Sequence, residues 1–90
     1  MADVDITVDC RISGQQADFE YDSDNTLAQF ITDLQGQAMA WGSGKAPDNA
    51  GISVDGQPGN NYNDNMSRTL ADIGVSSGSV IAVMQDITQA

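Results

Sequence analysis

The sequence predicts a single α+β domain in which one helix packs on one face of a sheet. Apolar and polar residues alternate strictly over residues 5–12 and again over 17–22, which is the period of a half-buried strand. An apolar stripe with helical spacing follows from Leu27 to Trp41, and the segment "SVIAVMQ" near the end is typical of a buried strand. Strands, then a helix, then further strands is an order that favours an α+β domain.

The two alternating runs predict a β-hairpin. Gly14 and its polar neighbours lie between the runs and supply the turn. The apolar face carries Ile6, Val8, Cys10, Ile12, Ala17, Phe19 and Tyr21. The opposite face carries the carboxylates of Asp5, Asp9, Asp18, Glu20 and Asp22. The hairpin is therefore expected to have one apolar and one acidic face.

The stripe that predicts the helix contains Leu27, Phe30, Ile31, Leu34, Ala38 and Trp41. Thr26, followed three residues later by Gln29, fits a capping box in which the Thr oxygen accepts from a backbone amide. Asp24 or Asn25 is an alternative cap. Gly36 destabilises a helix by about 1 kcal/mol relative to Ala, so the helix is expected to weaken beyond it.

The second half of the chain predicts shorter elements. Gly42 is a candidate helix stop, and the polar, Gly- and Asn-rich residues 42–50 and 56–67 read as mobile loops rather than functional segments. Between them, "GISVDG" predicts a short strand, and a minor edge strand is expected around Tyr62. "TLADIG" predicts one helical turn that ends at its glycine.

The last strand has apolar residues at both alternating sets of positions. We assign Val80, Ala82 and Met84 to the face that meets the helix, which leaves Ile81 and Val83 on the open face of the sheet. The predicted core comprises Ile6, Val8, Ile12, Phe19, Leu27, Phe30, Ile31, Leu34, Ile52, Val54, Leu70, Ile73, Val80 and Ala82.

Composition narrows the function classes. Ninety residues fit one domain over 1–90, with a core over about 4–85 and a short flexible tail over 86–90. The net charge of −10 disfavours nucleic acid and anionic membranes as partners, and it fits solubility, a salty environment or a basic protein partner. The absence of an 18-residue apolar run and of a signal peptide leads us to expect a cytoplasmic protein without membrane insertion.

Chemistry-bearing residues are few. With no His, the Ser-His-Asp and Cys-His arrangements are impossible, and the single Cys10 is expected to be a buried core residue rather than a nucleophile. The stretch from Asp22 to Thr26 starts like a calcium loop, but Leu27 and Asp33 stand where that loop needs Gly and Glu. "GSGK" lacks the first glycine of a phosphate loop. We therefore expect no catalytic residue, no metal site and no cofactor.

The order ββαββ, the helix start "DNTL" and the ending "TLADIGVSSGSVIAV" resemble ubiquitin and its β-grasp relatives, from about Val4 to Gln85. This resemblance implies a mixed sheet of four to five strands, with the first and last strands parallel at its centre and the helix across one face. Within that superfamily, "VDITVDC" and "LADIGVSSGSVIAV" are most similar to the small YukD-like proteins that accompany bacterial type VII secretion systems.

The resemblance also bears on function. Ubiquitin-like modifiers and sulfur carriers need a free C-terminal Gly-Gly, whereas this sequence ends "QDITQA" and its last glycine is Gly78. Conjugation is therefore disfavoured unless a longer precursor is cut. We expect a non-catalytic protein-interaction module that is an accessory or regulatory component of a bacterial assembly such as type VII secretion, with a basic protein or a component of a membrane complex as its partner. A modifier or sulfur carrier with a matured tail, or a small β-grasp subunit of a multicomponent enzyme, remains the alternative.

In ubiquitin, the outer face of the last strand contributes to the apolar patch that partners recognise. By this resemblance, Ile81 and Val83 are the predicted protein-binding residues, bordered by Thr7 and Arg11 on the neighbouring first strand. A second predicted surface is the acidic hairpin face, which would bind a basic partner through Asp5, Asp9, Asp18, Glu20 and Asp22.

Overall fold

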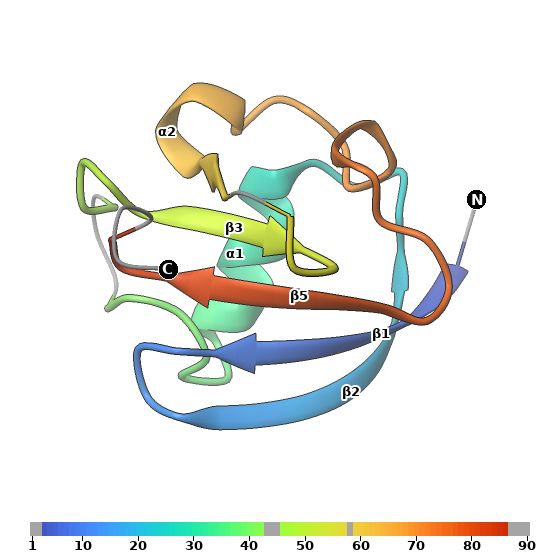
Figure 1. The fold of residues 1–90 in the computed structure, drawn as a ribbon, viewed down its shortest axis with the longest axis horizontal. Coiled ribbons are helices and arrows are strands. Elements are labelled where there is room, and N and C mark those ends of the chain that lie inside the picture. Colours follow the sequence, from blue (N-terminus) through green and yellow to red (C-terminus); the bar gives the residue numbers. More distant parts are fainter. Residues whose placement is uncertain (1–2, 43–45, 58, 87–90) are drawn as a thin grey trace.

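A computed structural model of the chain describes residues 3–42, 46–57 and 59–86 (Figure 1). Its elements are β1 (Asp3–Cys10), β2 (Gln15–Asp22), α1 (Leu27–Gln35), β3 (Gly51–Val54), β4 (Asn60–Asn61), α2 (Tyr62–Asn65), a 3-10 helical turn (Ala71–Ile73) and β5 (Ser79–Met84). None of the helices in these ranges is long and apolar enough to cross a membrane.

The five strands form one mixed sheet in the order β2-β1-β5-β3-β4. β1 and β5 pair in parallel at its centre, and the other neighbouring strands pair antiparallel. α1 crosses one face of this sheet (Figure 1). This is the ubiquitin-like β-grasp topology, so the predicted fold class is confirmed.

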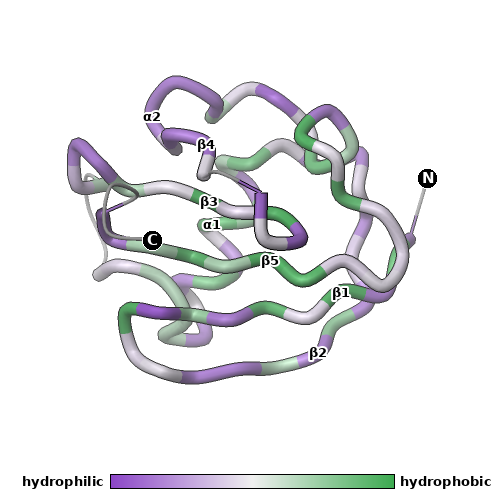
Figure 2. The backbone as a smooth tube through the Cα atoms, viewed as in Figure 1, coloured by the Kyte–Doolittle hydropathy of each residue, from purple (hydrophilic) through white to green (hydrophobic). Residues whose placement is uncertain are grey.

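The β1–β2 hairpin forms as its alternation predicts. Ile6 lies opposite Phe19 on the helix-facing side, and Asp5 lies opposite Glu20 on the other side. Gly14 takes a φ of 79° in the turn, and its amide donates to the carbonyl of Cys10 at 2.8 Å. That left-handed conformation strains residues with a Cβ, which explains the glycine. β2 is hydrophilic along most of its length, whereas β5 is mostly hydrophobic (Figure 2).

α1 begins where the capping pattern places it. The Thr26 Oγ1 accepts from the Gln29 amide at 3.2 Å, while the Gln29 side chain donates to Asp33 at 3.0 Å instead of reaching back to the cap. The helix ends at Gln35 and Gly36 is its C-cap, so the predicted weakening beyond Gly36 is confirmed and the prediction that Gly42 stops the helix is wrong. The chain leaves the helix through Ala38, whose φ is 59°, and this turn still carries Met39 and Trp41 into the core.

Most of the predicted core is confirmed. Nine of its residues are buried in one cluster: Ile6, Val8, Leu27, Phe30, Ile31, Leu34, Ile52, Val54 and Leu70. Ile12, Phe19 and Ile73 are half-buried against that cluster, and Ala82 is buried outside it. Val80 is wrong as a core residue, because its side chain is 45% exposed. Cys10 is fully buried and free, as predicted.

The segment after β3 is more structured than its composition indicates. β4 ends one residue before Tyr62, which confirms the minor edge strand, but α2 was not predicted. The side chain of Asn61 caps α2 by accepting from the Asp64 amide at 3.1 Å. Tyr62 packs edge-to-face on Trp41, with 4.9 Å between ring centroids, so this segment closes one end of the core. The predicted tail over 86–90 lies outside the described residues except for Asp86.

Candidate functional site

The sheet surface opposite α1, here called the open face, brings the two predicted surfaces together. The register of the hairpin places Asp3 opposite Asp22, Asp5 opposite Glu20, Thr7 opposite Asp18 and Asp9 opposite Gln16 on this face. Val80, Ala82 and Met84 of β5 continue it, with Thr7 beside Val80 and Ser53 beside Ala82. The acidic hairpin and the central strand therefore form one continuous surface.

The predicted orientation of Ile81 and Val83 is wrong. Both side chains are 0% exposed and belong to the core cluster under α1. The parallel register explains this, because it sets Ser79 beside Ile6 and Ile81 beside Val8. Ile6 and Val8 lie on the buried, helix-facing side of β1, so Ile81 lies on that side too. A partner cannot reach Ile81 or Val83 in the folded protein, so they are not binding residues of the open face.

Val80 occupies the position that was predicted for Ile81 and Val83. Its exposed side chain lies beside Thr7, whose hydroxyl donates to the Asp18 carboxylate at 2.7 Å. Ala82 and Met84, farther along the same strand, are 5% and 4% exposed. Among the described residues, the open face thus offers one accessible apolar side chain with a carboxylate close by.

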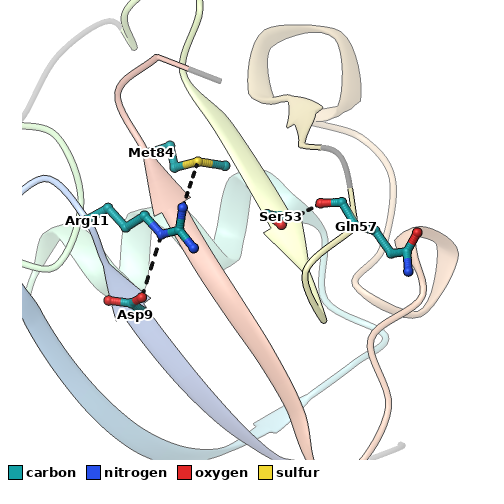
Figure 3. A network of polar contacts seen from close by, with 5 residues as sticks. All are labelled: Asp9, Arg11, Ser53, Gln57 and Met84. Atoms are coloured by element: carbon teal, nitrogen blue, oxygen red, sulfur yellow. Dashed lines mark hydrogen bonds and ion pairs between the residues drawn. The ribbon is translucent and has the colours of Figure 1, made fainter. Parts of the chain in front are cut away.

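Arg11 borders this face, as predicted (Figure 3). Its guanidinium lies 3.7 Å from the Asp9 carboxylate and 3.9 Å from the Met84 sulfur. The Arg11 and Asp9 side chains are 51% and 37% exposed, so this ion pair adds little to stability. The positively charged guanidinium of Arg11 therefore lies over the end of β5, at one end of the open face.

A shallow hollow of about 500 Å³ lies where β1 and β2 meet the start of β5. Its lining includes Asp5, Thr7, Asp18, Glu20 and Gly78. The Gly78 amide donates to the Asp5 carbonyl at 2.7 Å, which fixes the loop before β5 against β1. Within the described residues, no group of three or more His, Cys, Asp or Glu side chains is arranged to hold a metal ion.

The start of β5 is fixed by Asp55, which sequence reasoning missed. Its carboxylate accepts from the Val80 amide at 2.9 Å and from the Ser79 hydroxyl at 3.0 Å. Asp55 and Gly56 have φ values of 54° and 77°, and the Gln57 amide closes the turn on the Val54 carbonyl at 3.0 Å. This is the geometry of a type I′ turn, for which the sequence "DG" is the known signal.

A second bond ties the same turn to the sheet. The Ser53 hydroxyl donates to the Gln57 carbonyl at 2.6 Å (Figure 3). Because Ser53 lies beside Ala82, the turn and the middle of β5 are held together on the open face. The position of Val80 is therefore fixed by the hydrogen bonds of the Asp55 turn rather than by packing of its own side chain.

Cys10 and the segment that starts like a calcium loop both have structural roles. Cys10 has no exposed surface from which to react. Thr26 caps α1, and the Asp24 amide donates to the Asp22 side chain at 2.9 Å in the turn before it. Lys45 of "GSGK" lies outside the described residues.

No protein-family model and no curated protein matches this chain. The functional argument therefore rests on the fold and on the open face. The chain has the ubiquitin-like β-grasp fold, and its open face carries the hairpin carboxylates and the exposed Val80.

Proposed function

We propose that this protein is a non-catalytic ubiquitin-like module that binds a protein partner through its open face. The observation that carries the proposal is the exposed Val80, which lies beside Thr7 and its hydrogen-bonded partner Asp18. An apolar side chain on a central strand is held rigidly, so a partner can cover it at low conformational cost. The surrounding carboxylates favour a partner with basic residues and steer its approach.

The chemistry of the accessible side chains supports binding rather than catalysis. The one thiol is buried, and the hollow beside β1 is lined by carboxylates, by Thr7 and by the apolar Ile6 and Phe19, with no Cys, Lys or His among its lining residues. The resemblance of two segments to the YukD-like proteins makes an accessory or regulatory role in a bacterial assembly, type VII secretion first, the specific form of this proposal. Such a module needs no cofactor, nucleic acid or membrane insertion.

Two exposed apolar residues allow a matched test. Val80 is 45% exposed on the open face, and Met66 is 41% exposed after α2. Val80→Arg removes apolar contact and adds a charge that repels a basic partner, while Met66→Arg makes the same charge change elsewhere. Each tagged variant is expressed in the native host, and the co-purified proteins are identified and quantified.

We expect Met66→Arg to retain the partner of the unmodified protein and Val80→Arg to lose it, with both variants melting like the parent. Equal retention by both variants would refute the open face as the docking site. Intact mass from the host tests the modifier or carrier alternative, which shares this fold. Covalent adducts or a thiocarboxylate on a shortened chain would favour that alternative.

A further inference from the structure

β2 forms a long open edge of the sheet. It is the outermost strand, and across its eight residues, Gln15–Asp22, its one pairing partner in the described structure is β1. Figure 1 shows no other element beyond β2 at this rim. In an antiparallel edge strand, alternate residues point their N–H and C=O groups away from the sheet, where another strand can pair with them.

The opposite edge is different. β4 has two residues, Asn60–Asn61, and runs directly into α2. The Tyr62 amide at this point already donates to the Ala50 carbonyl at 2.8 Å. A very short edge strand that turns into a helix offers little length for pairing. β2 is therefore the edge that can accept an added strand.

The helix-facing side of β2 is apolar and only half-covered. Ala17, Phe19 and Tyr21 are half-buried against the core. The Tyr21 ring packs edge-to-face on Phe30 at 5.1 Å between centroids, and its hydroxyl donates to Asp33. An added strand would continue this layer if its side chains on the α1 side were apolar.

The other side of β2 is acidic. Asp18 and Glu20 are exposed two residues apart, which places them about 7 Å from each other along the strand. Asp33 adds a carboxylate on the α1 side. A second copy of β2 would set like charges against each other, which disfavours self-pairing, whereas a strand with Lys or Arg at alternate positions would be attracted.

We propose that the β2 edge binds an extended segment of a protein partner by strand addition. That segment alternates between Lys or Arg side chains, which face Asp18 and Glu20, and apolar side chains, which cover Phe19 and Tyr21. Backbone pairing supplies the affinity, and the alternation supplies the specificity. This edge is a second contact surface, separate from the Val80 surface of the open face.

The test uses a ten-residue peptide that alternates Lys and Val, titrated into the isotope-labelled full chain at low salt and followed by NMR. Two control peptides separate the contributions. One has the same Lys and Val residues in two blocks, so its charge is equal but no face is basic. The other has N-methyl groups on every second backbone amide, so its side chains are kept but strand pairing is blocked.

We expect the alternating peptide to bind, to shift the amide signals of β2, and to slow hydrogen exchange of its outward-facing amides. Both control peptides should bind at least several-fold more weakly. Glu20→Gln should weaken binding by about twofold to fivefold, the range for one cross-strand charge pair. Asp64→Asn in α2, beside the opposite edge, removes the same charge and should leave the affinity unchanged.

Three results would overturn the proposal: no binding of the alternating peptide, equal binding of the block or N-methylated peptide, or binding without added protection of β2. The last two would show that charge alone holds the peptide. Because this titration involves neither the native partner nor a Val80 variant, its failure and the failure of the open-face proposal are distinguishable.

Discussion

Val80 and Val83 allow the orientation of the central strand to be tested with one substitution at two positions. Val→Thr keeps the size and β-branching of the side chain, so strand propensity and shape change little. Val83 is 0% exposed, so its variant buries a hydroxyl that lacks an assured partner and loses one apolar methyl. A buried unpaired hydroxyl costs about 1–3 kcal/mol in protein mutational data. The side chain of Val80 is 45% exposed, and the change there should stay within about 0.5 kcal/mol.

The assay is urea unfolding followed by the fluorescence of Trp41, which is buried in the native core. With a urea slope of about 1–3 kcal/mol per molar, a loss near 2 kcal/mol lowers the midpoint of Val83→Thr by about 1 M. The midpoint of Val80→Thr should match that of the parent. Equal shifts, or a larger shift for Val80→Thr, would refute the orientation of β5 and with it the open face as described.

Three further predictions concern charge and support. The melting temperature should rise by several degrees from low salt to 0.5 M NaCl, because screening weakens repulsion between opposed pairs such as Asp5 and Glu20, and a flat or falling response would contradict this. Burial, then the bond to Asp33, raises the pKa of Tyr21, so its stabilising effect is complete below about pH 10 and is lost as the pH rises further. Urea midpoints from pH 8 to 11 should therefore fall less steeply for Tyr21→Phe than for the parent, and equal slopes would exclude this role. Asp55→Ala should cost about 1–3 kcal/mol by chemical denaturation, since it removes two hydrogen bonds to β5 and places Ala at a φ of 54°, whereas an unchanged midpoint would show that the turn does not anchor the strand.

The sequence was informative wherever one face of an element was apolar and the other polar. The hairpin has that contrast, so its strands, its turn at Gly14 and its acidic face were predictable. β5 lacks it, because alternate positions are apolar on both sides, and periodicity cannot choose between Val80 and Ile81. The pairing with β1 made that choice, and this contact joins residues far apart in the chain.

The end of α1 shows a different limit. The apolar stripe continues beyond Gln35 to Trp41, and Trp41 is buried, yet the helix has already ended. Core packing selects which side chains are inside and does not require that the backbone between them stay helical. Gly36 signals that the helix weakens here, but no residue signals the left-handed conformation of Ala38 that redirects the chain.

Of the candidate site, the composition of the acidic face could be predicted and its apolar centre could not. Thr7 and Arg11 lie on the open face as expected. The orientation of β5 is the reverse of the predicted one, because Val80 is exposed there while Ile81 and Val83 are buried. Asp55 was within reach, because "DG" directly after the apolar run of a predicted strand signals a tight turn. The open edge at β2 follows from the sheet order, which depends on long-range pairing that local patterns do not encode.

The parallel pairing of β1 with β5 also orders events during synthesis. The Arg11 and Met84 side chains that meet at the end of these strands are 73 residues apart in sequence. When the hairpin and α1 leave the ribosome, the central place in the sheet is still vacant, and Ile6, Val8 and Cys10 have no second neighbour to cover them. The core can close only after Ser79–Met84 has been released, so most of the nascent chain waits in a partly exposed state. Repulsion between the carboxylates on the hairpin disfavours pairing of its apolar strand with another copy at that stage.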